Sequence, residues 1–200
     1  MAKLTIGGTP FKTNGNLPVI GTQAPDFLLT RTDLSDTSLK DFAGKKAVLN
    51  IFPSIDTPVC SASVRRFNQE ISKFPGAVVL CASLDLPFAH SRFCETEGLK
   101  NVISVSEMRT RKFGDDYGLR MVDGPLAGLL ARAVVVINET GKVIYSKIVE
   151  ELKHEPDYEE VLSVLKTAGA DHLDVCTVSE TAEHSRPDDS DEPCDDGRAG

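Results

Sequence analysis

The sequence predicts an α/β sandwich, in which helices flank a mixed β-sheet, and three observations support this fold class. A mostly apolar run at residues 46–52 and a continuous apolar run at 76–84 predict two strands, and the second is typical of a strand that is buried on both faces. Each run is followed by a segment that we expect to be helical. Further along the chain, "ARAVVVIN" and "KVIYSKIV" are joined by the short turn "ETG" and predict a hairpin.

The N-terminal part predicts a hairpin, a connector and one helical turn. Residues 3–13, "KLTIGGTPFKT", favour two short alternating strands joined by a turn at Gly7-Gly8. Residues 14–30 contain two prolines and are expected to form an irregular connector. The stretch "SLKDFAGK" is typical of a single helical turn that ends at Gly44.

The next unit is expected to be a strand at 46–52 followed by a helix from about Pro58 to Lys73. Apolar side chains repeat along this helix at three- and four-residue spacing, at Val64, Phe67 and Ile71. A second unit pairs the strand at 76–84 with a helix.

The second helix is expected to run from about Pro87 to Glu97. We expect Asp85 to cap its N-terminus and Gly98 to end it. The stretch "NVISVS" then predicts a strand, and "RTRKFGDDYG" a short helix or turn.

The last predicted helix is the amphipathic segment "DYEEVLSVLKTAG", which ends at Gly169. The resulting order, strand–helix–strand–helix–strand–strand–helix, is that of the thioredoxin-like class, here with an added N-terminal β-hairpin. The sequence therefore predicts a thioredoxin-like domain at residues 1–169 and an acidic, disordered C-terminal tail at residues 170–200.

The net charge of −8 comes from the predicted tail. Residues 171–200 carry ten acidic and two basic side chains, whereas residues 1–170 carry twenty of each. Since neither part has a basic stripe, we expect no binding to nucleic acid.

Cysteine usage and hydropathy bear on the cellular compartment. The five cysteines are an odd number and include no CxxC pair, which argues against a secreted disulfide framework. No apolar run approaches the roughly 20 residues of a membrane span, and the N-terminus has no apolar stretch of signal-peptide length. We therefore expect a cytoplasmic protein that does not enter a membrane.

The stretch "NIFPSIDTPVC" places Cys60 at the start of a predicted helix. Pro58 suits the first helical turn and Thr57 is a natural N-cap residue. At such a helix start, unpaired amides and the helix dipole favour an anion and lower the pKa of a thiol from about 8.5. The sequence thus predicts a reactive thiol on an exposed turn instead of a buried one.

Two other side chains are candidates to assist this thiol. Thr57 carries a hydroxyl one helical turn before Cys60, and Arg132 interrupts an otherwise apolar strand. A guanidinium at a buried strand is costly unless it pairs with an anion, and a thiolate is such an anion.

Pro53, Thr57 and Cys60 reproduce the PxxxTxxC signature of peroxiredoxins. Together with "DLPFAHSRFC" and "GPLAGLLARAVVV", the chain resembles the thiol peroxidase subfamily of atypical two-cysteine peroxiredoxins over residues 1–169. The resemblance implies that Cys60 is the peroxidatic cysteine and Cys94 the resolving cysteine. It also implies that Pro53, Thr57 and Arg132 bind the peroxide and polarise its O–O bond.

The implied reaction is the reduction of hydrogen peroxide and alkyl hydroperoxides without a cofactor or metal ion. Cys60 is oxidised to a sulfenic acid and then forms a disulfide with Cys94, which thioredoxin reduces. The resemblance also implies a homodimer. Because both cysteines lie on predicted helices and a disulfide needs Cα atoms within about 7 Å, we expect one or both helices to unwind.

Other cysteines and histidines are given other roles. Cys81 lies within an apolar strand and is expected to be structural. His90 and Cys94 are four residues apart, which is only a weak zinc pattern, and His154 and His184 are expected to face solvent. The tail cysteines Cys176 and Cys194 have no family role: a second disulfide, competition as resolving thiols and no function all remain open. A redox carrier and a binding module that uses the acidic tail are the alternative functions.

Overall fold

The computed structural model describes residues 2–167 of the chain. The predicted tail, with Cys176, Cys194 and His184, lies outside the described residues. The elements in chain order are β1 (Lys3–Ile6), β2 (Thr9–Lys12), β3 (Leu28–Arg31), β4 (Asp36–Ser38), the 3₁₀ helix η1 (Leu39–Phe42), β5 (Lys46–Ile51), α1 (Pro58–Ile71), β6 (Ala77–Ser83), α2 (Pro87–Glu97), β7 (Val102–Ser106), α3 (Lys112–Asp116), β8 (Ala133–Ile137), β9 (Val143–Ile148) and α4 (Tyr158–Thr167).

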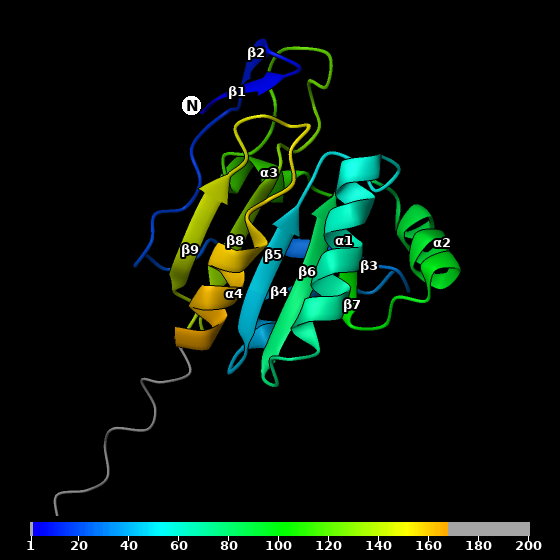
Figure 1. The fold of residues 1–200 in the computed structure, drawn as a ribbon, viewed down its shortest axis with the longest axis vertical. Coiled ribbons are helices and arrows are strands. Elements are labelled where there is room, and N and C mark those ends of the chain that lie inside the picture. The colour runs from blue at the N-terminus through cyan, green and yellow to red at the C-terminus, as the bar shows by residue number, and fades with distance from the viewer. Residues whose placement is uncertain (1, 168–200) are drawn as a thin grey trace, which may run out of the picture.

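A seven-stranded mixed sheet with the order β4-β3-β7-β6-β5-β8-β9 forms the centre of the molecule (Figure 1). Strands β5, β6 and β7 are parallel, β8 runs antiparallel to β5, and β9 runs antiparallel to β8. Every residue of β5 and β8 is buried, which explains why β8 is wholly apolar and why β5 is apolar except at Lys46 and Asn50. The predicted α/β class with a mixed sheet and the separate N-terminal hairpin β1–β2 are confirmed.

Two apolar clusters pack against the two faces of this sheet. On one face, α1 and α4 cover the sheet with side chains that include Val64, Phe67 and Val161; both helices lie in front of the central strands in Figure 1. On the other face, Phe42 of η1 and Phe113 of α3 belong to the second cluster. The sheet is therefore the middle layer, and α1 is held against it along its whole apolar side.

Two details differ from the sequence-based expectations. The expected connector at 14–30 ends in β3, which pairs with the unpredicted strand β4 in a short antiparallel hairpin. These strands are only four and three residues long, too short to give a clear alternation. Asp85 does not cap α2, because Leu86 is the N-cap residue and the Asp85 carboxylate instead accepts hydrogen bonds from Ser54 and Ile55.

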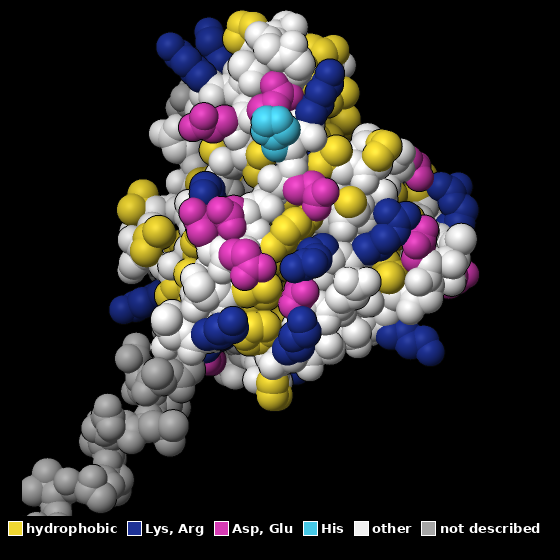
Figure 2. All heavy atoms as spheres, viewed as in Figure 1, with side chains coloured by type: hydrophobic (Ala, Val, Ile, Leu, Met, Phe, Trp, Pro, Cys, Tyr) yellow, Lys and Arg dark blue, Asp and Glu magenta, His cyan; other side chains and the backbone are white. Residues whose placement is uncertain are grey.

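The surface carries mixed charge. Figure 2 shows Lys and Arg side chains interspersed with Asp and Glu over the face formed by α1 and α4. Within residues 2–167, no helix has the length and hydropathy needed to cross a membrane.

Candidate active site

Cys60 is the third residue of α1, the helix that follows the carboxyl end of β5 (Figure 1). The first helical hydrogen bond in this turn runs from the Ser61 amide to the Thr57 carbonyl. The amides of Val59 and Cys60 precede that bond and lie at the positive end of the helix dipole. The predicted position of the thiol at a helix start is confirmed.

The predicted exposure of Cys60 is wrong, because the residue has 0% of its surface exposed. Cys60 precedes Val64 by four residues and Phe67 by seven, so it lies on the apolar stripe of α1 that faces the sheet. The same spacing that predicted the helix was enough to predict this burial. The thiol therefore lies inside the protein, where a nearby charge is poorly screened.

Arg132 is buried beside Cys60, with only 2% of its surface exposed. Its Nη2 lies 3.4 Å from the Cys60 Sγ and also donates a 3.1 Å hydrogen bond to the carbonyl of Leu152. Nε donates to the same carbonyl at 3.3 Å, whereas Nη1 is buried without a hydrogen-bond partner. One carbonyl thus fixes the guanidinium, and one of its nitrogens remains available next to the sulfur.

Thr57 is exposed and occupies the N-cap position of α1, as expected. Its hydroxyl does not cap the helix, however, but donates a 3.1 Å hydrogen bond to the Ser54 carbonyl. Since the only hydroxyl proton is used there, the oxygen is left with lone pairs that can accept a hydrogen bond. Pro53 is buried in the segment between β5 and α1, two residues after β5 ends.

Cys94 is half-buried on α2, and its thiol lies 3.3 Å from the hydroxyl of Ser104 in β7. Burial raises the pKa of the Cys94 thiol above its ordinary value. Cys60 instead contacts Arg132, immediately before β8, and the sheet places β6 and β5 between β7 and β8. Both cysteines are free in this structure, and their thiols have different contacts.

The remaining candidates behave as structural residues. Cys81 has 0% of its surface exposed, and burial raises the pKa of its thiol to about 12. The His90 Nε2 lies 2.9 Å from the Ser83 hydroxyl, and residues 2–167 contain no group of His, Cys, Asp and Glu side chains suited to hold a metal ion. The exposed position predicted for His154 is confirmed.

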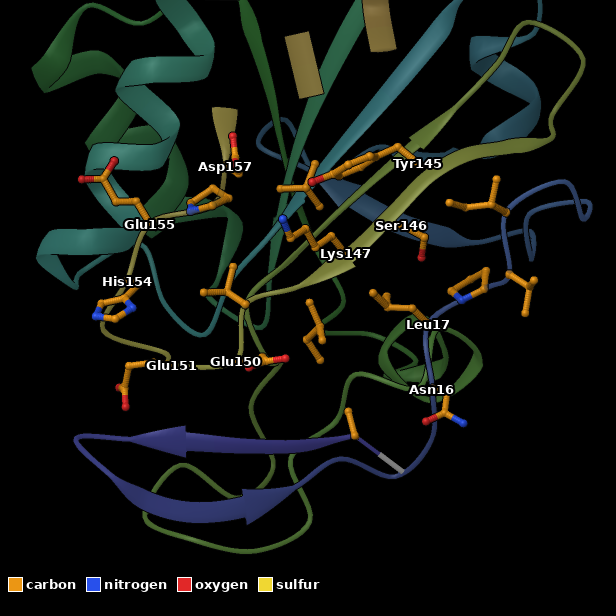
Figure 3. A pocket seen from close by; sticks show the side chains of 18 of the residues that line it. Asn16, Leu17, Tyr145, Ser146, Lys147, Glu150, Glu151, His154, Glu155 and Asp157 are labelled. Atoms are coloured by element: carbon orange, nitrogen blue, oxygen red, sulfur yellow. The ribbon is translucent and has the colours of Figure 1, made fainter. Parts of the chain in front are cut away.

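Of the hollows on the surface of the described residues, one borders the loop that precedes Cys60. A groove of about 890 Å³ lies between residues 16–20 and β9, with Leu17 on one side and Tyr145 and Lys147 on the other (Figure 3). Its lining does not include Cys60. A second hollow of about 720 Å³ is lined by Asp85, Leu86, Phe88 and Leu129 among others. Because Asp85 binds the loop that precedes α1, this hollow lies next to the Cys60 region.

Sequence reasoning missed two groups that shape the site. Asp85 binds the loop before α1, and the Leu152 carbonyl holds Arg132. Asp85 follows β6, the parallel neighbour of β5, and the carboxyl ends of parallel strands meet at one edge of the sheet. The position of Asp85 at the end of a predicted strand could therefore have been noticed in the sequence. The Leu152 carbonyl could not, because a backbone carbonyl in a loop leaves no pattern in the sequence.

The chain is similar to several known proteins. Residues 20–162 match the protein family described as Redoxin. A thiol peroxidase from Mycobacterium bovis is 51% identical over 165 residues, which cover 82% of this chain and 99% of that protein. A peroxiredoxin-like protein from Aquifex aeolicus is 35% identical with a TM-score of 0.79, covering 84% of this chain and 97% of that one.

A thiol peroxidase from Chromobacterium violaceum, 20% identical with a TM-score of 0.78, covers 84% of this chain and 98% of its own, and it supports the fold alone. Fold and matches together define the class: the protein is an oxidoreductase of the thioredoxin-like superfamily that acts as a peroxidase. Within that class, the chain belongs to the thiol peroxidase family of peroxiredoxins.

Proposed function

We propose that Cys60 is the peroxidatic cysteine and that it reduces hydrogen peroxide and alkyl hydroperoxides. The observation that carries this proposal is the 3.4 Å contact between the Cys60 Sγ and the buried Arg132 Nη2. The buried guanidinium can donate a hydrogen bond to the sulfur at this distance. It also lies where negative charge develops on the departing peroxide oxygen.

The unused hydrogen-bonding capacity around the sulfur suits a peroxide. The Arg132 Nη1 has no partner and can donate to a peroxide oxygen. The Thr57 oxygen has given its proton to Ser54 and can accept the peroxide O–H. One donor and one acceptor that flank a nucleophile align the O–O bond for attack.

In the first step the Cys60 thiolate attacks the terminal oxygen of the peroxide. The S–O bond forms as the O–O bond breaks, the other oxygen leaves as water or an alcohol after protonation, and Cys60 becomes a sulfenic acid. Because Cys60 has no exposed surface, we expect entry of the peroxide to depend on small movements of residues 53–59.

In the second step we propose that the Cys94 thiol attacks the sulfenic sulfur and releases water, giving a Cys60–Cys94 disulfide. The separate positions of the two thiols support the expected unwinding of α1, α2 or both. Burial keeps the Cys94 thiol protonated in the folded reduced state, and exposure during unwinding would make it more reactive.

The finer assignments rest on the family resemblance and on the surface near the site. Leu86 and Phe88 are 54% and 62% exposed in the hollow beside the Cys60 loop and suit the organic part of an alkyl hydroperoxide. We further propose thioredoxin as the reductant, a homodimer as the assembly and the cytoplasm as the compartment.

The test is peroxide-dependent oxidation of NADPH in the presence of thioredoxin and thioredoxin reductase. The wild-type protein should support turnover with hydrogen peroxide and with cumene hydroperoxide, and Cys60→Ser should not. Cys81→Ser is the matched control, because it removes a buried thiol that the mechanism does not use. Equal rates for the wild type and Cys60→Ser would refute the proposal.

A further inference from the structure

A chain of hydrogen bonds links the loop that carries Thr57 to the interior of the sheet. The Asp85 carboxylate accepts 2.7 Å and 2.8 Å hydrogen bonds from the Ile55 amide and the Ser54 hydroxyl. The Ser54 carbonyl in turn accepts the Thr57 hydroxyl. Asp85 therefore acts on Thr57 through one intervening residue.

Asp85 is itself held in place by Ser83, the last residue of β6. The Ser83 hydroxyl lies 2.7 Å from the Asp85 Oδ2, and it accepts the Asp85 amide at 3.1 Å. A carboxylate cannot donate, so the single hydroxyl proton of Ser83 points to Asp85. The carboxylate thus receives three hydrogen bonds and has a fixed orientation.

The same argument assigns the proton of His90 and connects the chain to α2. Because Ser83 gives its proton to Asp85, the contact of 2.9 Å with the His90 Nε2 requires that His90 donate from Nε2. Its buried Nδ1 then carries a lone pair, which agrees with the absence of a partner there. Burial lowers the pKa of His90, in keeping with a neutral ring.

We propose that Asp85 is a positioning residue for the peroxidase reaction, which fixes the loop at residues 54–57 and thereby the Thr57 oxygen that accepts the peroxide O–H. The inference rests on the proposed role of Cys60. Asp85 does not touch the sulfur or the peroxide, and it acts only through Ser54 and Ile55. His90 and Ser83 tie this support to α2, the helix that carries Cys94.

The test compares two reactions of Cys60 in the full chain. The rate constant for hydrogen peroxide depends on an aligned Thr57, whereas alkylation by iodoacetamide does not need a hydrogen-bonded peroxide. Asp85→Asn should lower the peroxide rate constant by about ten- to a hundred-fold, the range for hydrogen bonds to a charged group. The alkylation rate of Cys60, followed by mass spectrometry, should change little.

Two further variants keep the result interpretable. Ser54→Ala removes one donor to Asp85 with less disturbance and should lower the peroxide rate in the same direction, but less. Asp56→Asn is the matched control in the same loop, because the exposed Asp56 only pairs with Arg92 on the surface, and it should be close to wild type.

Three outcomes would overturn the inference: a wild-type peroxide rate in Asp85→Asn, parallel changes in both reactions, or an equal loss in Asp56→Asn. Failure of the proposed function gives a different result, because the wild type and Cys60→Ser would then consume peroxide equally.

Discussion

At the scale of single residues, the proposed role of Arg132 accounts for a side chain that is unfavourable for folding. A buried guanidinium loses hydration, and only the Leu152 carbonyl and the Cys60 sulfur compensate in the described structure. The unpaired Nη1 is therefore a cost to stability that the reaction explains.

Arg132→Lys should keep the positive charge but lose the planar arrangement of donors that reaches both Leu152 and Cys60. We expect the second-order rate constant for peroxide to fall by about a hundred-fold, typical of losing one donor to a developing negative charge. Stopped-flow mixing of the reduced protein with peroxide measures it. Arg109→Lys is the control, because Arg109 lies on the surface and pairs with Asp36, and it should match the wild type. Full activity of Arg132→Lys would contradict the role proposed for the Arg132 guanidinium.

Cys81, in contrast to Cys60, is predicted to be an unreactive thiol. Since burial raises the pKa of this thiol to about 12, it stays protonated from pH 7 to pH 9 and is also shielded from reagents. Iodoacetamide at pH 8 should modify Cys81 of the native protein more slowly than Cys94, because Cys81 is fully buried and Cys94 is half-buried. Peptide mass spectrometry checks this, with guanidinium-unfolded protein as the control in which both react. Equal labelling in the native state would show that β6 opens readily.

At the scale of elements, the sequence predicted every helix and all strands except β3 and β4. The apolar residues of β5 and β8 and the periodic apolar stripe of α1 are strong sequence patterns. In contrast, β3 and β4 are defined by the pairing of β3 with β4 and of β3 with β7, which no local pattern reveals. The site shows the same division. Thr57, Cys60 and Arg132 were found from local sequence, but the burial of Cys60 and the bonds of Asp85 depend on the packing of α1 and the register of β5 with β6.

The N-terminal hairpin has a structural connection to the site through Glu151. This carboxylate accepts hydrogen bonds from the Gly7 and Gly8 amides, and the neighbouring Leu152 amide donates to the Thr5 carbonyl. Because the Leu152 carbonyl also holds Arg132, the hairpin supports the loop that orients the guanidinium.

The hydrogen bonds between the Glu151 carboxylate and the hairpin, called the Glu151 clamp below, should weaken in acid. Hydrogen bonds, first of all from the Gly7 amide, lower the pKa of Glu151 from 4.5 to about 2. A lowered pKa in the folded state means that the carboxylate stabilises the fold above about pH 4.5, and that this contribution is lost as the pH falls towards 2. Glu151→Gln should therefore unfold at a lower temperature than the wild type at pH 6, with the difference shrinking below pH 4.5. A constant difference from pH 6 to pH 3, measured by circular dichroism, would contradict the Glu151 clamp.

The helix α2 should change most between the reduced and oxidised states. Disulfide formation must release Cys94 from Ser104 and bring it towards α1. After one equivalent of peroxide, we expect faster amide hydrogen exchange in residues 91–97, with α4 unchanged as an internal control. Peptide mapping should find Cys60 linked to Cys94. Equal protection of α2 in both states, with that disulfide present, would place the rearrangement in α1 alone.

At the scale of the whole molecule, the described residues 2–167 contain both apolar clusters, the complete sheet and all the side chains assigned to the reaction. The Mycobacterium bovis relative is matched over 99% of its length by 165 residues of this chain. We therefore propose that catalysis does not need the acidic segment at 171–200, which carries the whole net charge of −8. We expect its deletion to leave peroxidase turnover and the unfolding temperature unchanged while the protein elutes earlier from an anion exchanger. The double variant Cys176→Ser/Cys194→Ser in the full chain removes the two thiols of that segment but keeps its charge. If the deletion and the double variant lower turnover equally, these cysteines take part in resolving Cys60. The assignment of that role to Cys94 alone would then be wrong.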